Sequence, residues 1–282
     1  MDRLAAMSEP GAIVVLLDTS PASEAALSAA ARLAHHRNLE LVGLFIEERD
    51  LLHSAAYPFA REISVLSGTS RPFDSEILRS RLDLQRRRIE RQLQQEAGAL
   101  SLTWRLHVET GSVQEALAGM GIRAEILLLG KTGWSGSHGR RLGASATQVI
   151  SGTDCTIVLW EGTPWPARGP VQALITDPDS GPAIARMAAV LAGVADRPLH
   201  LLFAPGLDPS REPDVLAALG PQAAPVTVER LGVASPAALA RSLRRRPGGE
   251  LVIGRSGPAA LGCDLAELVT LTDTPVVLVP AT

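Results

Sequence analysis

The chain has 282 residues, enough for two domains that each bury a core of their own. Its formal net charge of -3 at pH 7 gives no overall attraction for nucleic acid or for an anionic membrane. Residues 1–10 carry acidic side chains without an apolar core, and no apolar run reaches the length of a membrane span, so we expect a soluble cytoplasmic protein. Cys155 and Cys263 are too few for a disulfide framework or a metal cluster, and we expect both to be buried free thiols.

The first part of the chain alternates strand and helix patterns. Residues 12–17 are an unbroken apolar run, typical of a parallel strand covered on both faces. Ser20 and Pro21 then suit the N-cap and first position of a helix. Further strands are predicted at 39–46, 102–108, 126–129 and 156–160, and helices at 113–120 and 144–150. This alternation predicts an α/β fold with a parallel sheet and right-handed crossovers.

An insertion separates the second and third predicted strands, at about residues 47–98. Asp74 suits a helix cap, and an amphipathic helix over the sheet edge is expected from one apolar face, formed by Leu78, Leu82, Gln85, Ile89 and Leu93. The arginines at 86–88 either bind phosphate or nucleic acid or form a solvated face, and interspersed acidic residues favour the solvated face.

The second part of the chain repeats the pattern. Its strands are predicted at 171–175, 199–203, 226–231, 251–253 and 276–279. A turn-rich segment with three prolines at 161–170 forbids a regular element there. We therefore predict one domain at 1–163, including the insertion, and a second at 168–282.

A glycine loop supports the interpretation of the chain as a duplicated fold. Gly130-Lys131-Thr132-Gly133, nine residues and then Gly143 follow the fourth predicted strand, and Gly254-Arg255-Ser256-Gly257 occurs 124 residues later. Each copy has another glycine eleven residues before an aspartate that opens the last strand. The second copy has only four residues between Gly257 and Gly262, five fewer than the first. Such self-similarity indicates two tandem copies.

The loop and Asp18 predict a mononucleotide site. In an open parallel sheet ligands bind at the carboxyl ends of the strands where the strand order reverses, which brings Asp18 beside Gly130. Glycines let a backbone approach phosphate, and the helix after Gly143 adds its positive N-terminal end. An aspartate accepts hydrogen bonds from a base amino group or a ribose hydroxyl.

These residues resemble the universal stress protein family, in a tandem form that covers nearly the whole chain. The resemblance rests on Leu17-Asp18-Thr19-Ser20, with the aspartate closing the first strand, and on Gly130, Gly133 and Gly143 at the family's spacing. It implies two adenine nucleotide alpha hydrolase-like, doubly wound sheets of strand order 3-2-1-4-5. It also implies that the two halves pair through their last strands as a pseudo-dimer, and it allows a homodimer.

The resemblance further implies an adenine nucleotide such as ATP, with Mg carried by its phosphates. Adenine is expected near Asp18 and the backbone around Phe45. The implied site consists of Leu17, Asp18, Phe45, Gly130, Lys131, Thr132, Gly133, Gly143, Ala144 and Ser145.

Two departures weaken this expectation. Ala144 replaces the hydroxyl expected after the third glycine, and Ser145 lies one position late. Losing one such hydrogen bond costs about 0.5 to 1.5 kcal/mol, which does not abolish binding, and Lys131 with Arg140 or Arg141 offsets it. The shortened second loop predicts an empty second site with Asp177 as a relic.

The sequence thus favours a cytoplasmic stress-response or regulatory protein that binds adenine nucleotide in its first half without efficient catalysis. One alternative is a nucleotide-free scaffold or protein-interaction module that makes contact through the insertion around residues 57–62. A third is a hydrolase using Ser145 or Asp18. No Walker A motif, nucleophile elbow or metal-ligand cluster is found, and at most slow ATP hydrolysis is expected.

Overall fold

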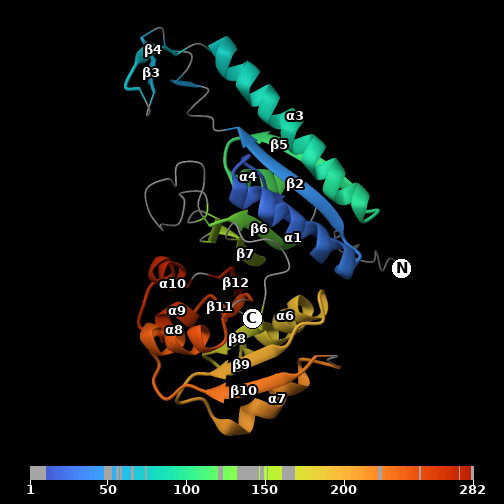
Figure 1. The fold of residues 1–282 in the computed structure, drawn as a ribbon, viewed down its shortest axis with the longest axis vertical. Coiled ribbons are helices and arrows are strands. Elements are labelled where there is room, and N and C mark those ends of the chain that lie inside the picture. The colour runs from blue at the N-terminus through green and yellow to red at the C-terminus, as the bar shows by residue number, and fades with distance from the viewer. Residues whose placement is uncertain are drawn as a thin grey trace, which may run out of the picture.

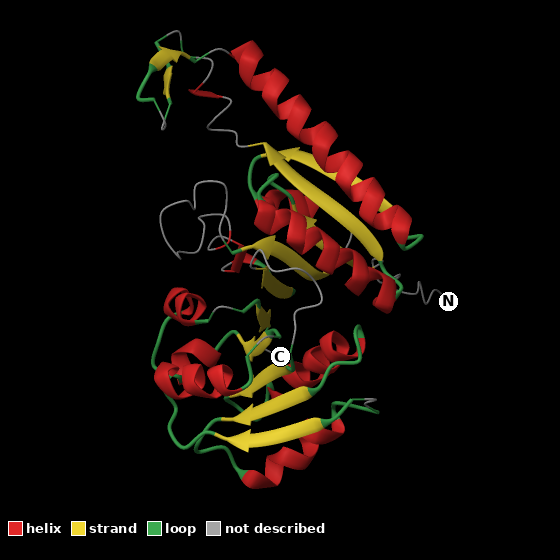
Figure 2. Cartoon of the chain, in the orientation of Figure 1, coloured by secondary structure: helices red, strands yellow, loops and turns green. Residues whose placement is uncertain are grey.

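The computed structural model describes residues 11–47, 53–54, 57, 59–64, 67–73, 75–119, 123–131, 146, 149–150, 152–160, 169–221, 224–247, 249–272 and 274–280. These residues contain a ten-stranded sheet in the order β10-β9-β8-β11-β12-β7-β6-β1-β2-β5 (Figure 1). Helices cover both of its faces (Figure 2). The α/β fold with a large parallel sheet that the sequence predicts is therefore confirmed.

The first half supplies five neighbouring parallel strands of this sheet, in the spatial order β7-β6-β1-β2-β5. In chain order, without the small hairpin described below, they are arranged 3-2-1-4-5. The elements are β1 (Gly11–Leu16), α1 (Pro21–Arg37), β2 (Glu40–Glu47), α3 (Ser75–Ala99), β5 (Trp104–Thr110), α4 (Val113–Gly119), β6 (Arg123–Gly130) and β7 (Thr156–Trp160).

The second half repeats the arrangement with five parallel strands, in the spatial order β10-β9-β8-β11-β12. Its elements are β8 (Val171–Ile175), α6 (Gly181–Gly193), β9 (Leu199–Phe203), the 3-10 turn η1 (Pro209–Arg211), α7 (Glu212–Ala217), β10 (Val226–Arg230), α8 (Pro236–Arg245), β11 (Leu251–Gly254), α9 (Gly257–Ala260), α10 (Leu265–Leu271) and β12 (Val276–Val279). All ten predicted strands are present, with ends displaced by at most three residues.

The two halves join through one antiparallel contact between β7 and β12. Val158 pairs with Val277, and these valines occupy equivalent positions of the repeat. Their neighbours pair crosswise, Ile157 with Leu278 and Leu159 with Val276. Such self-complementary pairing is that of a two-fold symmetric interface, here made within one chain. It turns two five-stranded sheets into one and leaves neither last strand as an open edge.

Two apolar layers lie between the sheet and its helices. One contains buried side chains of α1, α3, α6 and α7, and the other contains those of α4, α8 and α10. Helix α1 begins as predicted, because the Ser20 hydroxyl accepts a hydrogen bond from the Ser23 amide at 3.2 Å. It ends at Arg37, and the following residue Asn38 has a left-handed φ of 53°, which suits a helix C-cap.

The insertion forms an arm along the edge of the sheet. Helix α3 contacts β2, β5 and α1, and Ile89, Leu93 and the partly buried Leu82 of its predicted apolar face join the apolar layer there. Leu78 of the same face is also buried, which confirms the predicted apolar face. Gly43 on β2 makes room for it, since a Cβ there would lie 2.8 Å from a Leu93 methyl carbon. The arginines at 86–88 are exposed, as a solvated face requires. The predicted capping residue Asp74 lies outside the described residues.

A short antiparallel hairpin on this arm was not predicted. It consists of β3 (Arg61–Ile63) and β4 (Ser70–Pro72), and it stands away from the main sheet (Figure 1). Its strands are three residues long and nearly all exposed, so they carry no alternating apolar pattern for sequence analysis to detect.

Candidate functional site

The predicted site residues lie where the strand order reverses. Strands β1 and β6 are neighbours, and the chain leaves them toward opposite faces of the sheet. Leu17 follows β1 and is buried, and its amide donates to the Leu44 carbonyl at 2.9 Å. Asp18 comes next and is partly exposed at the carboxyl edge, the usual ligand side of such sheets.

The turn after Asp18 is tightly built. The Asp18 carboxylate accepts a hydrogen bond from the Ser20 amide at 2.9 Å, and the Asp18 amide donates to the Ser23 hydroxyl at 3.4 Å. Thr19 between them has a φ of 64°, a left-handed conformation that is unfavourable for a β-branched residue. Backbone strain of this kind costs of order 1–3 kcal/mol and gathers at functional sites.

Phe45 lies on the strand beside Asp18. Its side chain is buried in the core under α1 and α3, so only its backbone is available to a ligand. Strand β1 pairs with β2 as far as Leu44, whereas β2 continues to Glu47 and pairs there with β5 alone. The backbone of residues 45–47 therefore extends beyond the last paired residue of β1, next to Asp18.

Gly130 ends β6 against the start of α1. A Cβ at this position would lie 2.9 Å from the Ala22 Cβ and 3.5 Å from the Ser23 nitrogen. Because Ser23 also accepts from Asp18, the structure brings Gly130 and Asp18 together as predicted. The glycine is thus required for the close approach of strand and helix, in addition to any approach of the loop to phosphate.

Lys131 is oriented differently from the expectation that it faces a phosphate. Its side chain is buried, and Nζ donates to the carbonyl oxygens of Thr272 at 3.1 Å and Thr274 at 2.5 Å, both in the second half. The physical reason is that the junction of β7 and β12 brings these carbonyls beside the end of β6.

The remaining predicted site residues follow Lys131 in the sequence. Thr132, Gly133, Gly143, Ala144 and Ser145 lie outside the described residues. The same applies to Arg140 and Arg141. Just beyond them, Ala146 and Val149 are buried in the core below the sheet.

The second half uses the corresponding positions differently. The Asp177 carboxylate accepts from the Ser180 amide at 2.8 Å, the Ser180 hydroxyl at 2.5 Å and the Ser256 hydroxyl at 3.4 Å. Burial alone would raise the pKa of Asp177, but the hydrogen bonds from Ser180 and Ser256 outweigh it and lower the pKa. In place of a long loop, Gly257–Ala260 form the short helix α9. Asp177 therefore links the ends of β8 and β11 internally.

Arg255 mirrors Lys131, and sequence analysis missed this pair. It follows Gly254 as Lys131 follows Gly130, and its guanidinium donates to the carbonyl oxygens of Ile150 at 3.1 Å and Cys155 at 2.8 Å in the first half. The available signal was a basic residue directly after the strand-ending glycine in both copies.

Other polar chemistry is limited among the described residues. They contain no group of three or more histidine, cysteine or acidic side chains able to hold a metal ion. No described helix is long and apolar enough to cross a membrane. Cys155 and Cys263 are free but partly exposed, which corrects the expectation of full burial. Burial is the main cause that raises the pKa of each thiol.

Comparisons with known proteins agree with this geometry. Across 96% of this chain and 98% of the other, the fold is similar to that of a universal stress protein from Archaeoglobus fulgidus DSM 4304, with a TM-score of 0.62 and 14% identity. A functionally unknown protein from Pseudomonas aeruginosa PAO1 gives a TM-score of 0.57 at 17% identity, covering 97% and 93% of the two chains.

A putative universal stress protein from Pseudomonas aeruginosa UCBPP-PA14 gives a TM-score of 0.54 at 17% identity, covering 97% and 94%. No curated protein matches the sequence significantly. The model of the universal stress protein family matches residues 11–160, which contain Asp18, Phe45 and the whole glycine loop. The chain belongs to the universal stress protein family.

Proposed function

We propose that this protein is a cytoplasmic stress-response or regulatory protein whose first half binds an adenine nucleotide, ATP or a relative, without efficient catalysis. The observation that carries the proposal is that Asp18 and Gly130 both lie next to Ser23, where the strand order reverses. The Asp18 amide donates to the Ser23 hydroxyl, and Gly130 packs against the backbone of Ala22 and Ser23. An acceptor carboxylate and a glycine-led loop are the two parts that a mononucleotide site of this topology needs.

The roles of the residues follow from their chemistry. Asp18 accepts a hydrogen bond from the base or the ribose, and the backbone beyond Leu44 on β2 meets the adenine edge. Leu17 and the buried Phe45 hold these groups in place. The loop from Gly130 through Thr132, Gly133 and Gly143 to Ala144 and Ser145 encloses the phosphates, with Mg as their counterion.

The second half contributes no nucleotide site in this proposal. Support comes from Asp177, whose carboxylate already accepts three hydrogen bonds. Further support comes from α9, which takes the place of a phosphate loop. The duplication thus retains one binding half and one supporting half.

The test is a calorimetric titration of the purified chain with ATP, ADP and AMP. We expect binding by the wild type, loss of at least about tenfold in affinity for Asp18→Ala, and unchanged binding for the matched variant Asp177→Ala. Gly130→Ala is a poor probe of binding because its Cβ would also disturb α1. No heat at about millimolar nucleotide, or binding that survives Asp18→Ala, contradicts the proposal. Rapid ATP turnover contradicts the absence of efficient catalysis.

A second function, protein interaction through the insertion, is favoured by one observation. Tyr57 and Phe59 near the hairpin are 56% and 78% exposed, and their rings stack at 5.4 Å. A nucleotide-free scaffold would show this interaction and no calorimetric signal with nucleotide.

A further inference from the structure

Exposed apolar side chains concentrate on the insertion. We call residues 57–99 the insertion arm, of which 57, 59–64, 67–73 and 75–99 are described. Among all described residues nine large apolar side chains are exposed, and the arm carries five of them, Tyr57, Phe59, Ile63, Ile77 and Leu84. The other four are spread over the second half, at Leu216, Val228, Val233 and Leu271. Five exposed apolar side chains on one segment make the arm the candidate interaction surface, whereas scattered exposure is ordinary.

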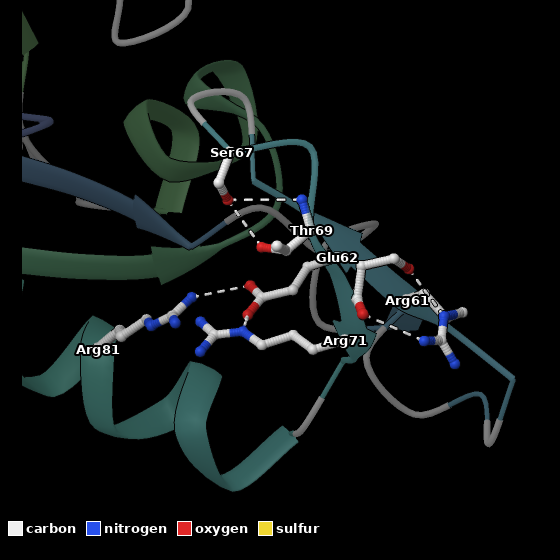
Figure 3. A network of polar contacts seen from close by, with 7 residues as sticks. Arg61, Glu62, Ser67, Thr69, Arg71 and Arg81 are labelled. Atoms are coloured by element: carbon white, nitrogen blue, oxygen red, sulfur yellow. Dashed lines mark hydrogen bonds and ion pairs between the residues drawn. The ribbon is translucent and has the colours of Figure 1, made fainter.

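The hairpin of the arm is braced against α3. The Glu62 carboxylate on β3 accepts hydrogen bonds from Arg71 on β4 and, at 3.0 Å, from Arg81 on α3 (Figure 3). These two contacts hold the pKa of Glu62 below its usual range. Arg61 donates to the Ser70 hydroxyl at 2.8 Å across the hairpin. The Tyr57 and Phe59 rings stack on each other beside this hairpin, so the two exposed aromatic side chains form one joint apolar surface.

Charge distinguishes the arm from the rest of the molecule. The arm holds eight arginines and six acidic residues, whereas the remainder of the chain holds 19 basic and 24 acidic residues. Arg79, Arg86 and Arg87 are exposed and make no ion pair with another described residue. A surface that combines aromatic residues with arginine has the composition of interface hot spots.

We propose that the insertion arm docks on the acidic body of a second copy of this chain, in a reciprocal two-fold dimer. A net positive arm and a net negative body are complementary between two copies. Two-fold symmetry also forms the arm-to-body contact twice in each dimer. An aromatic side chain buries about 150–250 Å² at most, so one arm tip alone falls short of the roughly 1,200 Å² of a stable interface, while two braced arms approach it. An anionic bilayer is disfavoured because it would repel the acidic body.

The test is light scattering of the full chain after size exclusion, with Phe59→Asp and the matched variant Val233→Asp. Val233 is 60% exposed in the second half, so both changes introduce one carboxylate at an exposed apolar site. We expect the wild type and Val233→Asp at close to twice the chain mass of 29.7 kDa. Phe59→Asp is expected to raise the dimer dissociation constant at least about tenfold, with an unchanged circular dichroism spectrum.

Charge and geometry are tested separately. The triple change Arg79→Glu, Arg86→Glu and Arg87→Glu should weaken the dimer, as should about 0.5 M salt. A photo-cross-linking amino acid at Phe59 should join two chains at residues outside the arm of the second chain. The proposal is overturned by a monomeric wild type at about 100 µM protein, by a dimer that Phe59→Asp leaves intact, by arm-to-arm cross-links, or by a monomer that binds phosphatidylglycerol vesicles.

Discussion

Lys131 and Arg255 make equivalent contacts in opposite directions across the junction of the two halves. Lys131 Nζ lies 2.5 Å from the Thr274 carbonyl oxygen, and the Arg255 guanidinium lies 2.8 Å from that of Cys155, the position that corresponds to Thr274. Each basic residue follows the glycine that ends the fourth strand of its own half. The two-fold relation set by Val158 and Val277 therefore extends to the side chains at both ends of the junction.

We predict that Lys131→Met destabilises the protein by about 1–3 kcal/mol, because carbonyls of the second half lose a buried charged donor. Arg255→Met should have a similar effect for the same reason. The measurement is urea denaturation, and Arg79→Met, on an exposed position of α3, is the control expected within about 0.5 kcal/mol of the wild type. If Arg79→Met lowered the free energy of unfolding as much as Lys131→Met does, the contacts of Lys131 across the junction would have no stabilising effect of their own.

Asp18 and Asp177 occupy equivalent positions in the two halves, but we expect Asp177 to contribute more to the free energy of unfolding. Asp177→Ala removes three hydrogen bonds and should cost about 1 kcal/mol or more in free energy of unfolding, whereas Asp18→Ala removes one and should cost less. Since the folded state lowers the pKa of Asp177, its contribution is present above the ordinary pKa of 3.8 and is lost as the pH falls below it. Thermal denaturation at pH 6 and pH 3 measures this. A difference between wild type and Asp177→Ala that persists undiminished at pH 3 contradicts it.

Gly130→Ala should destabilise by about 1–3 kcal/mol, because its Cβ would lie 2.9 Å from the Ala22 Cβ and force β6 and α1 apart. Gly98→Ala is the matched substitution, on α3 with nothing within 4 Å of the new Cβ. It should stabilise the helix by up to about 1 kcal/mol. Chemical denaturation measures the change in the free energy of unfolding for each variant. A decrease for Gly130→Ala with an increase for Gly98→Ala supports the packing role of Gly130, and changes of the same sign argue against it.

A buried ion pair gives a pH-dependent prediction. Arg197 lies 2.5 Å from Glu250 at side-chain exposures of 7% and 0%. Burial raises the pKa of Glu250 above its ordinary 4.5, and Arg197 opposes that rise. Arg197→Met leaves the carboxyl buried without its cation, so we expect a loss of about 3–5 kcal/mol at pH 7.

The sign of the pH dependence follows from proton uptake. In Arg197→Met the folded state holds the Glu250 proton more tightly than the unfolded chain, so stability falls as the pH rises above about 4.5. Urea denaturation at pH 5 and pH 7 should show the larger loss at pH 7. The double variant with Glu250→Leu should recover most of the loss at both values. A loss from Arg197→Met that is the same at pH 5 and pH 7 contradicts this explanation.

The fold was predictable because strand periodicity and chain order carry it. Continuous apolar runs such as residues 12–17 are typical of strands covered on both faces, and the duplicated glycines align the two copies in the sequence. The hairpin at Arg61–Ile63 and Ser70–Pro72 was not predictable, since its strands are short and exposed and carry no apolar alternation.

Only part of the candidate site was predictable. Asp18 and Gly130 meet as expected because topology alone brings the ends of β1 and β6 together. The orientation of Lys131 depends on carbonyls some 140 residues away in sequence, at Thr272 and Thr274, which no local pattern reveals. Asp177 likewise has a structural role, because Ser256, in the turn between β11 and α9, donates one of its hydrogen bonds.

Of the two duplicated halves, only the first is proposed to bind nucleotide. Equilibrium dialysis with radiolabelled ATP measures the number of nucleotides bound per chain at saturation. We predict one nucleotide per chain for the wild type and for Asp177→Ala, and a strongly reduced affinity for Asp18→Ala. No bound nucleotide, two per chain, or one that Asp18→Ala leaves unaffected would contradict it.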